Sequence, residues 1–198
     1  MDCRLDSLCR QMNGRLESQC KDTKNKSMAE KKNAISYESI MKDLKARKFA
    51  PVYVLMGDEP FYIDKICDYI AENVLQPEER DFNQTVLFGA DTTAVQVVDQ
   101  CKGYPMMAEF RVVIVKEAQN LKSLDALEKY LEKPVKSTIL VICNKNGSID
   151  RRKKFIPRAE QVGVVFESKK LYDRQLPGFI ASYLKARKAT IAPQAVQR

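Results

Sequence analysis

Short apolar runs alternate with stretches of helical periodicity through the middle of the chain. The runs are nearly continuous in apolar residues, as is typical of strands buried on both faces of a sheet. They lie at residues 51–56, 85–88, 111–115, 138–143 and 164–166. In the segments between them, apolar residues recur every three or four positions, which predicts helices. Because strands and helices alternate, we expect an α/β fold with a parallel sheet and helices on both of its faces.

Residues that commonly cap helices precede most of the helical stretches. The expected caps are, in chain order, Ser36, Asp58, Thr92 or Thr93, and Ser123. On the third of these helices, the apolar face carries Val95, Val98 and Cys101. A basic helix over residues 151–162 is expected before the last strand.

The two ends of the chain differ from this alternating region. Residues 1–33 are polar and charged without sustained periodicity, which predicts a mobile N-terminal arm. Met28 could be the true translation start, so it stays open whether residues 1–27 belong to the protein. Residues 34–170 are expected to form the α/β domain. Residues 171–198 carry one amphipathic helix that cannot bury its own apolar face, which predicts the beginning of a helical lid domain.

Composition sets limits on the class of protein. The chain has 198 residues, of which 44% are hydrophobic, enough to bury one full domain and part of a second. No apolar stretch is long enough to cross a bilayer, and charged residues interrupt the N-terminus where a signal peptide would need an apolar core. We therefore expect a cytoplasmic protein that does not contact membranes. The net charge of +8 suggests an anionic partner only weakly, because solvated lysines give the same total.

The cysteine pattern and the absence of histidine argue against a metal site. The six cysteines are Cys3, Cys9, Cys20, Cys67, Cys101 and Cys143. None of them forms a CxxC pair, and a zinc site of mixed Cys and His ligands is excluded. The last three lie among apolar neighbours and are interpreted as small buried residues in a reducing compartment. Without histidine the chain also lacks the usual general base of Ser and Cys enzymes, so we expect neither catalysis nor a cofactor.

The turn after the first strand is where a nucleotide-binding sheet carries its phosphate loop. A working loop has the pattern GxxxxGK[ST], in which backbone amides and a lysine hold phosphate and a hydroxyl holds magnesium. Residues 57–64 keep the first glycine, Gly57, but lack the second glycine, the lysine and the hydroxyl. Asp58 and Glu59 place negative charge at a helix N-terminus, where it would repel phosphate, and Pro60 lacks an amide proton. We expect that this loop binds no nucleotide.

A second part of ATPase chemistry is also missing. The strand at 111–115 is followed by Lys116 and a single Glu117, where an ATPase needs an acidic pair to hold magnesium and activate water. Glu117 is interpreted as a surface carboxylate. The sequence thus predicts the shape of a P-loop ATPase without its catalytic groups.

Five segments in a characteristic order resemble the delta subunit of the bacterial DNA polymerase III clamp loader. They are residues 51–64, 81–83, 104–119, 138–145 and 150–154. The resemblance runs from about Ser36 to the end of the chain. It implies an AAA+-like domain that binds no nucleotide, followed by a small helical lid and a helical collar that assembles the loader. The collar is missing, so the chain resembles the N-terminal portion of such a subunit.

The resemblance also implies a site and partners. Delta subunits press a pair of adjacent hydrophobic residues, carried on a short helix, into a pocket on the sliding clamp, the beta subunit. The matching residues are Met106 and Met107, which follow Pro105. A turn started by proline can present two side chains outward, and the flexible thioether of methionine adapts to an apolar pocket. The residues alone leave open that both methionines are core residues. The other implied partners are the remaining loader subunits and the DNA inside the assembled loader.

Two alternatives remain at this point. One is an active P-loop ATPase of related fold, which would need the missing lysine. The other is a non-specific DNA-binding module that uses a basic run to contact phosphates. The run consists of Lys145, Arg151, Arg152, Lys153, Lys154 and Arg158. These residues could equally form a solvated face, or make weak DNA contacts inside a clamp loader.

Overall fold

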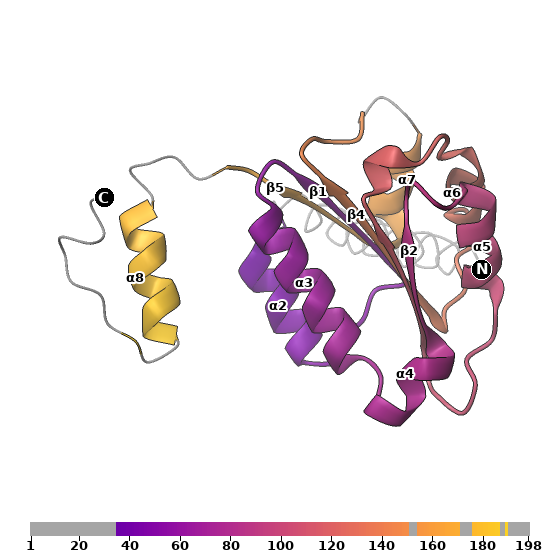
Figure 1. Cartoon of the computed structure of the whole chain (residues 1–198), viewed down its shortest axis with the longest axis horizontal. Helices are drawn as coiled ribbons and strands as arrows, with labels where there is room; N and C mark the ends of the chain where they lie inside the picture. Colours follow the sequence, from indigo (N-terminus) through magenta and orange to yellow (C-terminus); the bar gives the residue numbers. More distant parts are fainter. Residues whose placement is uncertain (1–34, 151–153, 171–175, 187–188, 190–198) are drawn as a thin grey trace, which may run out of the picture. The chain divides into compact units, whose positions relative to one another are not determined.

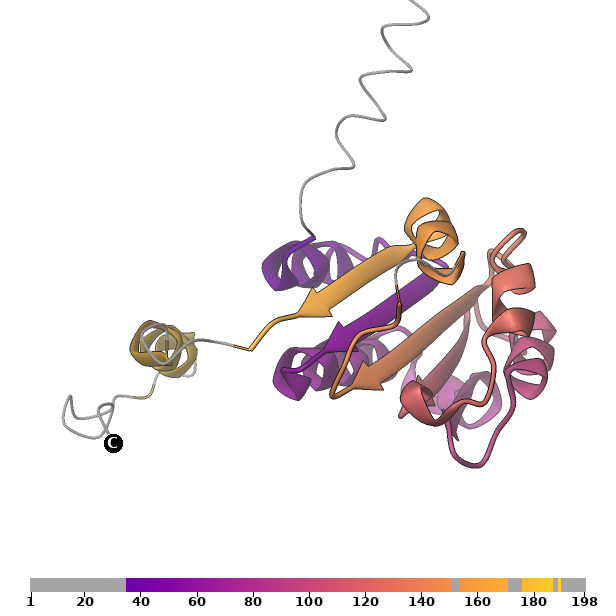
Figure 2. The ribbon, with the colours of Figure 1, turned by 90° about the horizontal axis from the view of Figure 1, so that it is seen from above.

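Five parallel strands form the centre of the structure. The computed structural model describes residues 35–150, 154–170, 176–186 and 189. The strands are β1 (Val52–Gly57), β2 (Gln84–Phe88), β3 (Arg111–Lys116), β4 (Thr138–Lys145) and β5 (Val164–Ser168). Their order across the sheet is β2-β3-β4-β1-β5, and every neighbouring pair is parallel. Figure 2 shows the arrows of β5, β1 and β4 pointing the same way. The predicted parallel α/β sheet is confirmed, and each strand overlaps its predicted segment.

Helices cover both faces of this sheet. They are α2 (Tyr37–Lys45), α3 (Pro60–Asn73), α4 (Pro77–Asn83), α5 (Ala94–Lys102), α6 (Asp125–Tyr130), α7 (Phe155–Val162) and α8 (Leu176–Ala186), with a short 3-10 helix, η2 (Ala118–Asn120). Helices α2 and α3 pack on one face, and α5, α6 and α7 pack on the other (Figure 1). Among the described residues, no helix has the length and apolar character needed to cross a membrane.

The central strand β1 shows why both faces must be covered. All six of its residues are buried. Val52, Val54 and Met56 belong to the core beneath α5, α6 and α7, whereas Tyr53 and Leu55 belong to the core beneath α2 and α3. Successive side chains of a strand point to opposite faces, so a continuous apolar run needs two cores. Each fully buried side chain of this size contributes about 1.5–3 kcal/mol from its removal from water.

Several helix limits differ from those expected. Ser36 caps α2 and Thr93 caps α5, as predicted, but Glu59 rather than Asp58 caps α3. Helix α6 has Leu124 at its N-cap position, one residue after Ser123. Val95 is exposed, and the buried face of α5 is instead made by Ala94, Val97, Val98 and Cys101. Helix α4 was not predicted.

Parts of the predicted organisation lie outside the described residues. These are the N-terminal arm at 1–33, the start of the basic helix at 151–153, and the end of the chain from residue 190. The expected helix of the lid is present as α8, over Leu176–Ala186. Its membership of a second domain stays a prediction.

Cys67, Cys101 and Cys143 are unpaired and buried, which confirms their interpretation as small core residues. Burial raises the pKa of the Cys101 thiol to about 12. The thiol of Cys101 therefore stays protonated in the folded chain at pH values where an exposed cysteine would be a thiolate.

Gly57 allows a close approach between the end of β1 and the end of β5. Its φ is +132°, and a Cβ atom built there would lie 2.0 Å from the carbonyl oxygen of Ser168. A side chain at this position is therefore excluded both by backbone conformation and by contact. Gly147 has a comparable φ of +146°, but a Cβ atom there would meet nothing within 4 Å.

We predict that Gly57→Ala lowers the free energy of unfolding by about 3 kcal/mol or more, because β5 would have to move away from β1. Gly147→Ala is the matched control, since it carries only the conformational cost of about 1–2 kcal/mol. Urea unfolding followed by circular dichroism measures both. Equal losses in the two variants would contradict the close approach at Gly57.

A second prediction concerns alkaline pH. The ordinary pKa of a cysteine thiol is 9.0, and that of Cys101 in the folded chain is about 12. Between these values the unfolded chain releases a proton that the folded chain keeps, so the free energy of unfolding falls as pH rises. The share of Cys101 in this slope is about 1.4 kcal/mol per pH unit. Urea unfolding at pH 8 to 11 should show a shallower slope for Cys101→Ala than for the wild type, and parallel slopes would refute the assignment.

Candidate functional site

The residues of the degenerate phosphate loop, 57–64, follow the carboxyl end of β1. In a nucleotide-binding loop the backbone amides point at phosphate. Here the N–H of Gly57 donates to the carbonyl of Gly147 at 3.0 Å, and the N–H of Asp58 donates to the carbonyl of Ser168 at 3.1 Å. Two amides of the loop are thus occupied by the protein's own carbonyls.

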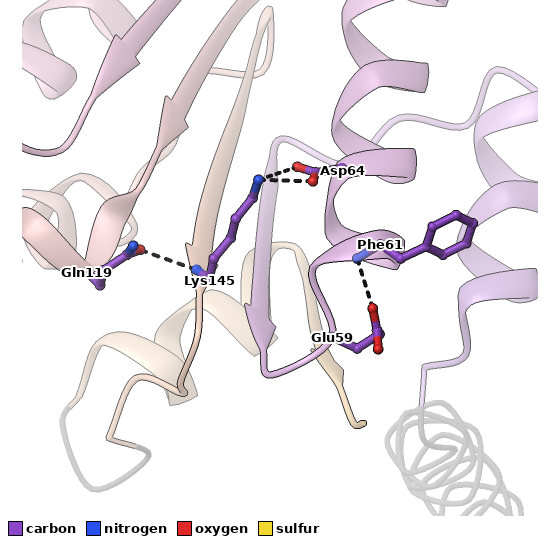
Figure 3. Close-up of polar contacts among 5 residues, drawn as sticks. All are labelled: Glu59, Phe61, Asp64, Gln119 and Lys145. Atoms are coloured by element: carbon purple, nitrogen blue, oxygen red, sulfur yellow. Dashed lines mark hydrogen bonds and ion pairs between the residues drawn. The ribbon is translucent and has the colours of Figure 1, made fainter. Parts of the chain in front are cut away.

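A carboxylate occupies the N-terminus of α3. The Oε1 atom of Glu59 accepts a hydrogen bond from the N–H of Phe61 at 3.3 Å (Figure 3). Pro60 is the first residue of the helix and has no N–H to offer. Asp58 is exposed and does not cap the helix. The negative charge expected at this helix terminus is present, and Glu59 is the residue that accepts from the backbone.

An ion pair occupies the place of the missing magnesium ligand. Asp64 stands where the pattern of a working loop has its hydroxyl residue. The Nζ atom of Lys145, at the end of β4, lies 2.7 Å from Oδ1 and 2.9 Å from Oδ2 of Asp64 (Figure 3). This hydrogen bond raises the pKa of Lys145 above its usual value, against the lowering effect of partial burial. The carboxylate at the hydroxyl position is therefore neutralised from within the chain.

The polar side chains of the segment after β3 also form hydrogen bonds within the protein. Glu117 is exposed and adopts a left-handed backbone conformation with a φ of +54°. Its carboxylate accepts a hydrogen bond from the side chain of Asn120 at 3.3 Å. Nearby, the side-chain oxygen of Gln119 accepts from the N–H of Lys145 at 3.2 Å (Figure 3). Within the described residues, no group of three His, Cys, Asp or Glu side chains could hold a metal ion.

The two methionines lie in a different place, in the segment 104–110 between α5 and β3, here called the methionine turn. This segment has no helix, unlike the short helix that the family resemblance implied. The side chain of Met106 is 60% exposed and that of Met107 is 101% exposed. The reading of both as core residues is therefore wrong. Of the two neighbouring aromatics, Tyr104 is exposed, whereas Phe110 packs edge-on against Phe49.

The structure brings α4 to the methionine turn. Asn83, the last residue of α4, accepts from the N–H of Met106 and donates to its carbonyl. An apolar groove of ≈ 390 Å³ lies beside this contact, lined by Glu78, Glu79, Phe82, Met106 and Met107. Phe82 is 65% exposed, so three large apolar side chains reach the surface together.

Sequence reasoning gave Phe82 and Asn83 no role, because α4 itself was missed. A signal for the helix exists. Pro77 followed by Glu78 and Glu79 is typical of a first helical turn, and Glu79 does accept from the N–H of Gln76 at 2.9 Å.

The basic run is partly neutralised. Lys145 is paired with Asp64, and Arg158 lies 3.3 Å from Glu128 and 2.7 Å from Glu132. Lys154 is exposed at the start of α7. Arg151, Arg152 and Lys153 lie outside the described residues, so the proposed phosphate contacts there stay a prediction.

Comparisons with known proteins identify the family of the chain. The family model of the DNA polymerase III delta subunit matches residues 53–169. The DNA polymerase III subunit delta of Bacillus subtilis (strain 168) is 27% identical over 168 residues, covering 80% of this chain and 48% of the relative. The solved structure of the Bacillus subtilis DNA clamp loader delta protein matches with a TM-score of 0.69 and 26% identity, covering 82% of this chain and 51% of that one. The chain spans about half the length of both relatives.

These matches confirm the resemblance seen in the sequence and the AAA+-like fold class that it implied. The matched region runs from the second residue of β1 to just beyond the end of β5, and therefore includes both the degenerate phosphate loop and the methionine turn. The chain belongs to the family of DNA polymerase III delta subunits.

Proposed function

We propose that this chain is the clamp-binding part of a clamp-loader delta subunit, and that it binds and opens the sliding clamp through Met106 and Met107. The observation that carries the proposal is the complete exposure of Met107. A large apolar side chain that its own fold leaves fully exposed is unfavourable in water, and a group of such side chains is typical of a surface that a partner covers. The neighbouring exposed side chains of Met106 and Phe82 extend this surface.

The proposed opening needs no chemistry from the chain. If the two methionines bind best to a clamp whose subunit interface is distorted, binding shifts the clamp population toward the open ring. The differential affinity for the open and closed forms limits how far the equilibrium moves. A flexible pair of thioethers in a preformed pocket is suited to such a contact.

The chain is proposed to hydrolyse no ATP. Its phosphate-loop amides are engaged by Gly147 and Ser168, and its Asp64 carboxylate is paired with Lys145. A nucleotide would have to break these contacts and accept a carboxylate beside its phosphates. Any energy from ATP would therefore enter through other subunits of the loader.

The remaining partners follow from the family. The proposal includes the other clamp-loader subunits as partners of the whole protein and DNA as a ligand of the assembled loader. A clamp-loader subunit works where the replicated DNA lies, so a cytoplasmic location belongs to the same proposal. Within this chain, Arg151, Arg152, Lys153 and Lys154 are the candidates for contact with DNA phosphates.

The clamp contact is tested by truncating the two methionines. Met106→Ala/Met107→Ala should weaken binding to the cognate sliding clamp by at least 2 kcal/mol, roughly 30-fold, as expected for exposed anchors of an interface. Isothermal titration calorimetry measures the affinity, and circular dichroism should show an unchanged fold. Val95→Ala is the matched control, because Val95 is 59% exposed on α5 and lies outside the methionine turn. Unchanged binding by the double variant would place the contact elsewhere.

The closed phosphate loop is tested with ATP itself. Titration of a fluorescent ATP analogue with magnesium should give no saturable binding at micromolar concentrations, for the reasons given above. A related ATPase with an intact phosphate loop is the positive control. Micromolar affinity in the present chain would contradict the proposal and favour an active ATPase.

A further inference from the structure

Asn83 is the polar residue that joins α4 to the methionine turn. Its side chain is fully buried, with 0% exposure. The Oδ1 atom accepts from the N–H of Met106 at 2.6 Å, and the Nδ2 atom donates to the carbonyl of Met106 at 2.8 Å. One side-chain amide therefore satisfies both backbone groups of a single residue. The second proton of Nδ2 goes to the carbonyl of Glu79 at 3.0 Å, so every polar group of the Asn83 side chain has a partner.

The helix that carries Asn83 is itself fixed. At the start of α4, the Oε2 atom of Glu79 accepts from the N–H of Gln76 at 2.9 Å, and the N–H of Glu79 donates to the carbonyl of Gln76 at 3.0 Å. The Nη2 atom of Arg80 donates to the carbonyl of Glu72, in α3, at 2.6 Å. Strand β2 begins directly after Asn83. Asn83 thus lies between a helix that is hydrogen-bonded to α3 and a strand of the sheet, so its own position is fixed. The methionine turn is bonded to this fixed residue.

The backbone conformation of the methionine turn needs stabilisation from other residues. Met107 has a φ of +54°, a left-handed conformation that costs a non-glycine residue roughly 1–2 kcal/mol. Burial of the Met107 side chain does not offset this cost, because the side chain is entirely exposed. At the other end of the turn, the N–H of Arg111 donates to the carbonyl of Ser137 at 2.8 Å. The backbone of the methionine turn is therefore held by Asn83 at Met106 and by this bond at Arg111.

We infer that Asn83 is a positioning residue for the clamp contact: it holds the backbone at Met106 so that Met106 and Met107 are presented in their binding conformation before the clamp arrives. This inference rests on the proposed function. A preformed turn avoids the cost of ordering exposed side chains and backbone on binding, which increases affinity without a new contact. Asn83 itself, being buried, does not touch the partner.

The experiment compares affinities of the full chain for its cognate sliding clamp by isothermal titration calorimetry. Loss of the two hydrogen bonds to Met106 in Asn83→Ala should weaken binding roughly tenfold, since the competent turn conformation becomes a minor population. Because Asn83 acts through the two methionines, adding Asn83→Ala to Met106→Ala/Met107→Ala should weaken binding no further than Met106→Ala/Met107→Ala alone. Asn144→Ala is the matched control: Asn144 is a buried asparagine whose Nδ2 holds a loop by donating to Gly147, at the far end of β4, and its loss should leave clamp binding unchanged.

The outcomes separate this inference from the proposed function. If Met106→Ala/Met107→Ala weakens binding but Asn83→Ala does not, or if the effect of Asn83→Ala simply adds to that of Met106→Ala/Met107→Ala, the positioning role of Asn83 is refuted and the clamp contact stands. If the wild type does not bind, or if Met106→Ala/Met107→Ala binds normally, the proposed function itself is refuted.

A measurement on the wild type avoids any loss of folding in the variants. The amide proton of Met106 should exchange with solvent at least tenfold more slowly than that of Met107, because the Met106 amide is bonded to Asn83 in the free chain, whereas the Met107 amide has no acceptor among the described residues. Hydrogen exchange followed by NMR resolves the two amides. Exchange of the Met106 amide at the rate of an unstructured peptide would overturn the inference.

Discussion

Burial of β1 on both faces is the constraint on which the rest of the structure depends. Its six residues are inaccessible to water, and it pairs in parallel with β4 and β5. A parallel sheet sets the amino ends of all its strands along one edge and the carboxyl ends along the other. With strands of five to eight residues, the edges lie roughly 16–26 Å apart. The methionine turn and Asn83 precede strands, whereas the phosphate loop and Lys145 end strands, so the two regions lie at opposite edges.

This separation places the degenerate phosphate loop and the exposed methionines in different parts of one scaffold. The carboxyl edge is where open α/β sheets usually bind their ligands. In this chain the backbone amides and the Asp64 carboxylate at that edge are bonded to other groups of the protein. The exposed apolar residues lie beside α4 at the other edge. Of the basic run, Lys145 and Arg158 are engaged by carboxylates.

Much of the fold could be predicted from the sequence because its strands are apolar on both faces. The runs at β1, β3 and β4 have no competing interpretation, and Ser36 and Thr93 cap their helices as their chemistry suggests. The errors fall where local rules are ambiguous. Asp58 and Glu59 are adjacent carboxylates, and only the three-dimensional path of the loop decides which one caps α3. Helix α4 has seven residues and little apolar periodicity, so its pattern was too weak to recognise.

Less of the candidate site than of the fold could be predicted from the sequence. Exposure of Met106 and Met107 could be expected only from the family resemblance, because methionine is among the residue types most often buried in cores. The bond between Asn83 and Met106 joins residues 23 positions apart, and no periodicity encodes such a pairing. Asn83 lies directly before an apolar strand, where an asparagine would ordinarily be interpreted as a turn residue.

The contacts around Asp64 and Lys145 bear on the evolutionary history of the carboxyl edge. Restoring a hydroxyl residue at position 64 would leave the ammonium group of Lys145 without its carboxylate, while the amides of Gly57 and Asp58 would still be bonded to Gly147 and Ser168. Restoring a lysine at position 63 would replace Ile63, which is completely buried. Neither substitution alone would therefore rebuild a phosphate-binding loop, and each alone would remove a favourable contact of the present fold. On the proposal that the phosphate loop binds no nucleotide, this mutual dependence makes single substitutions insufficient to restore binding.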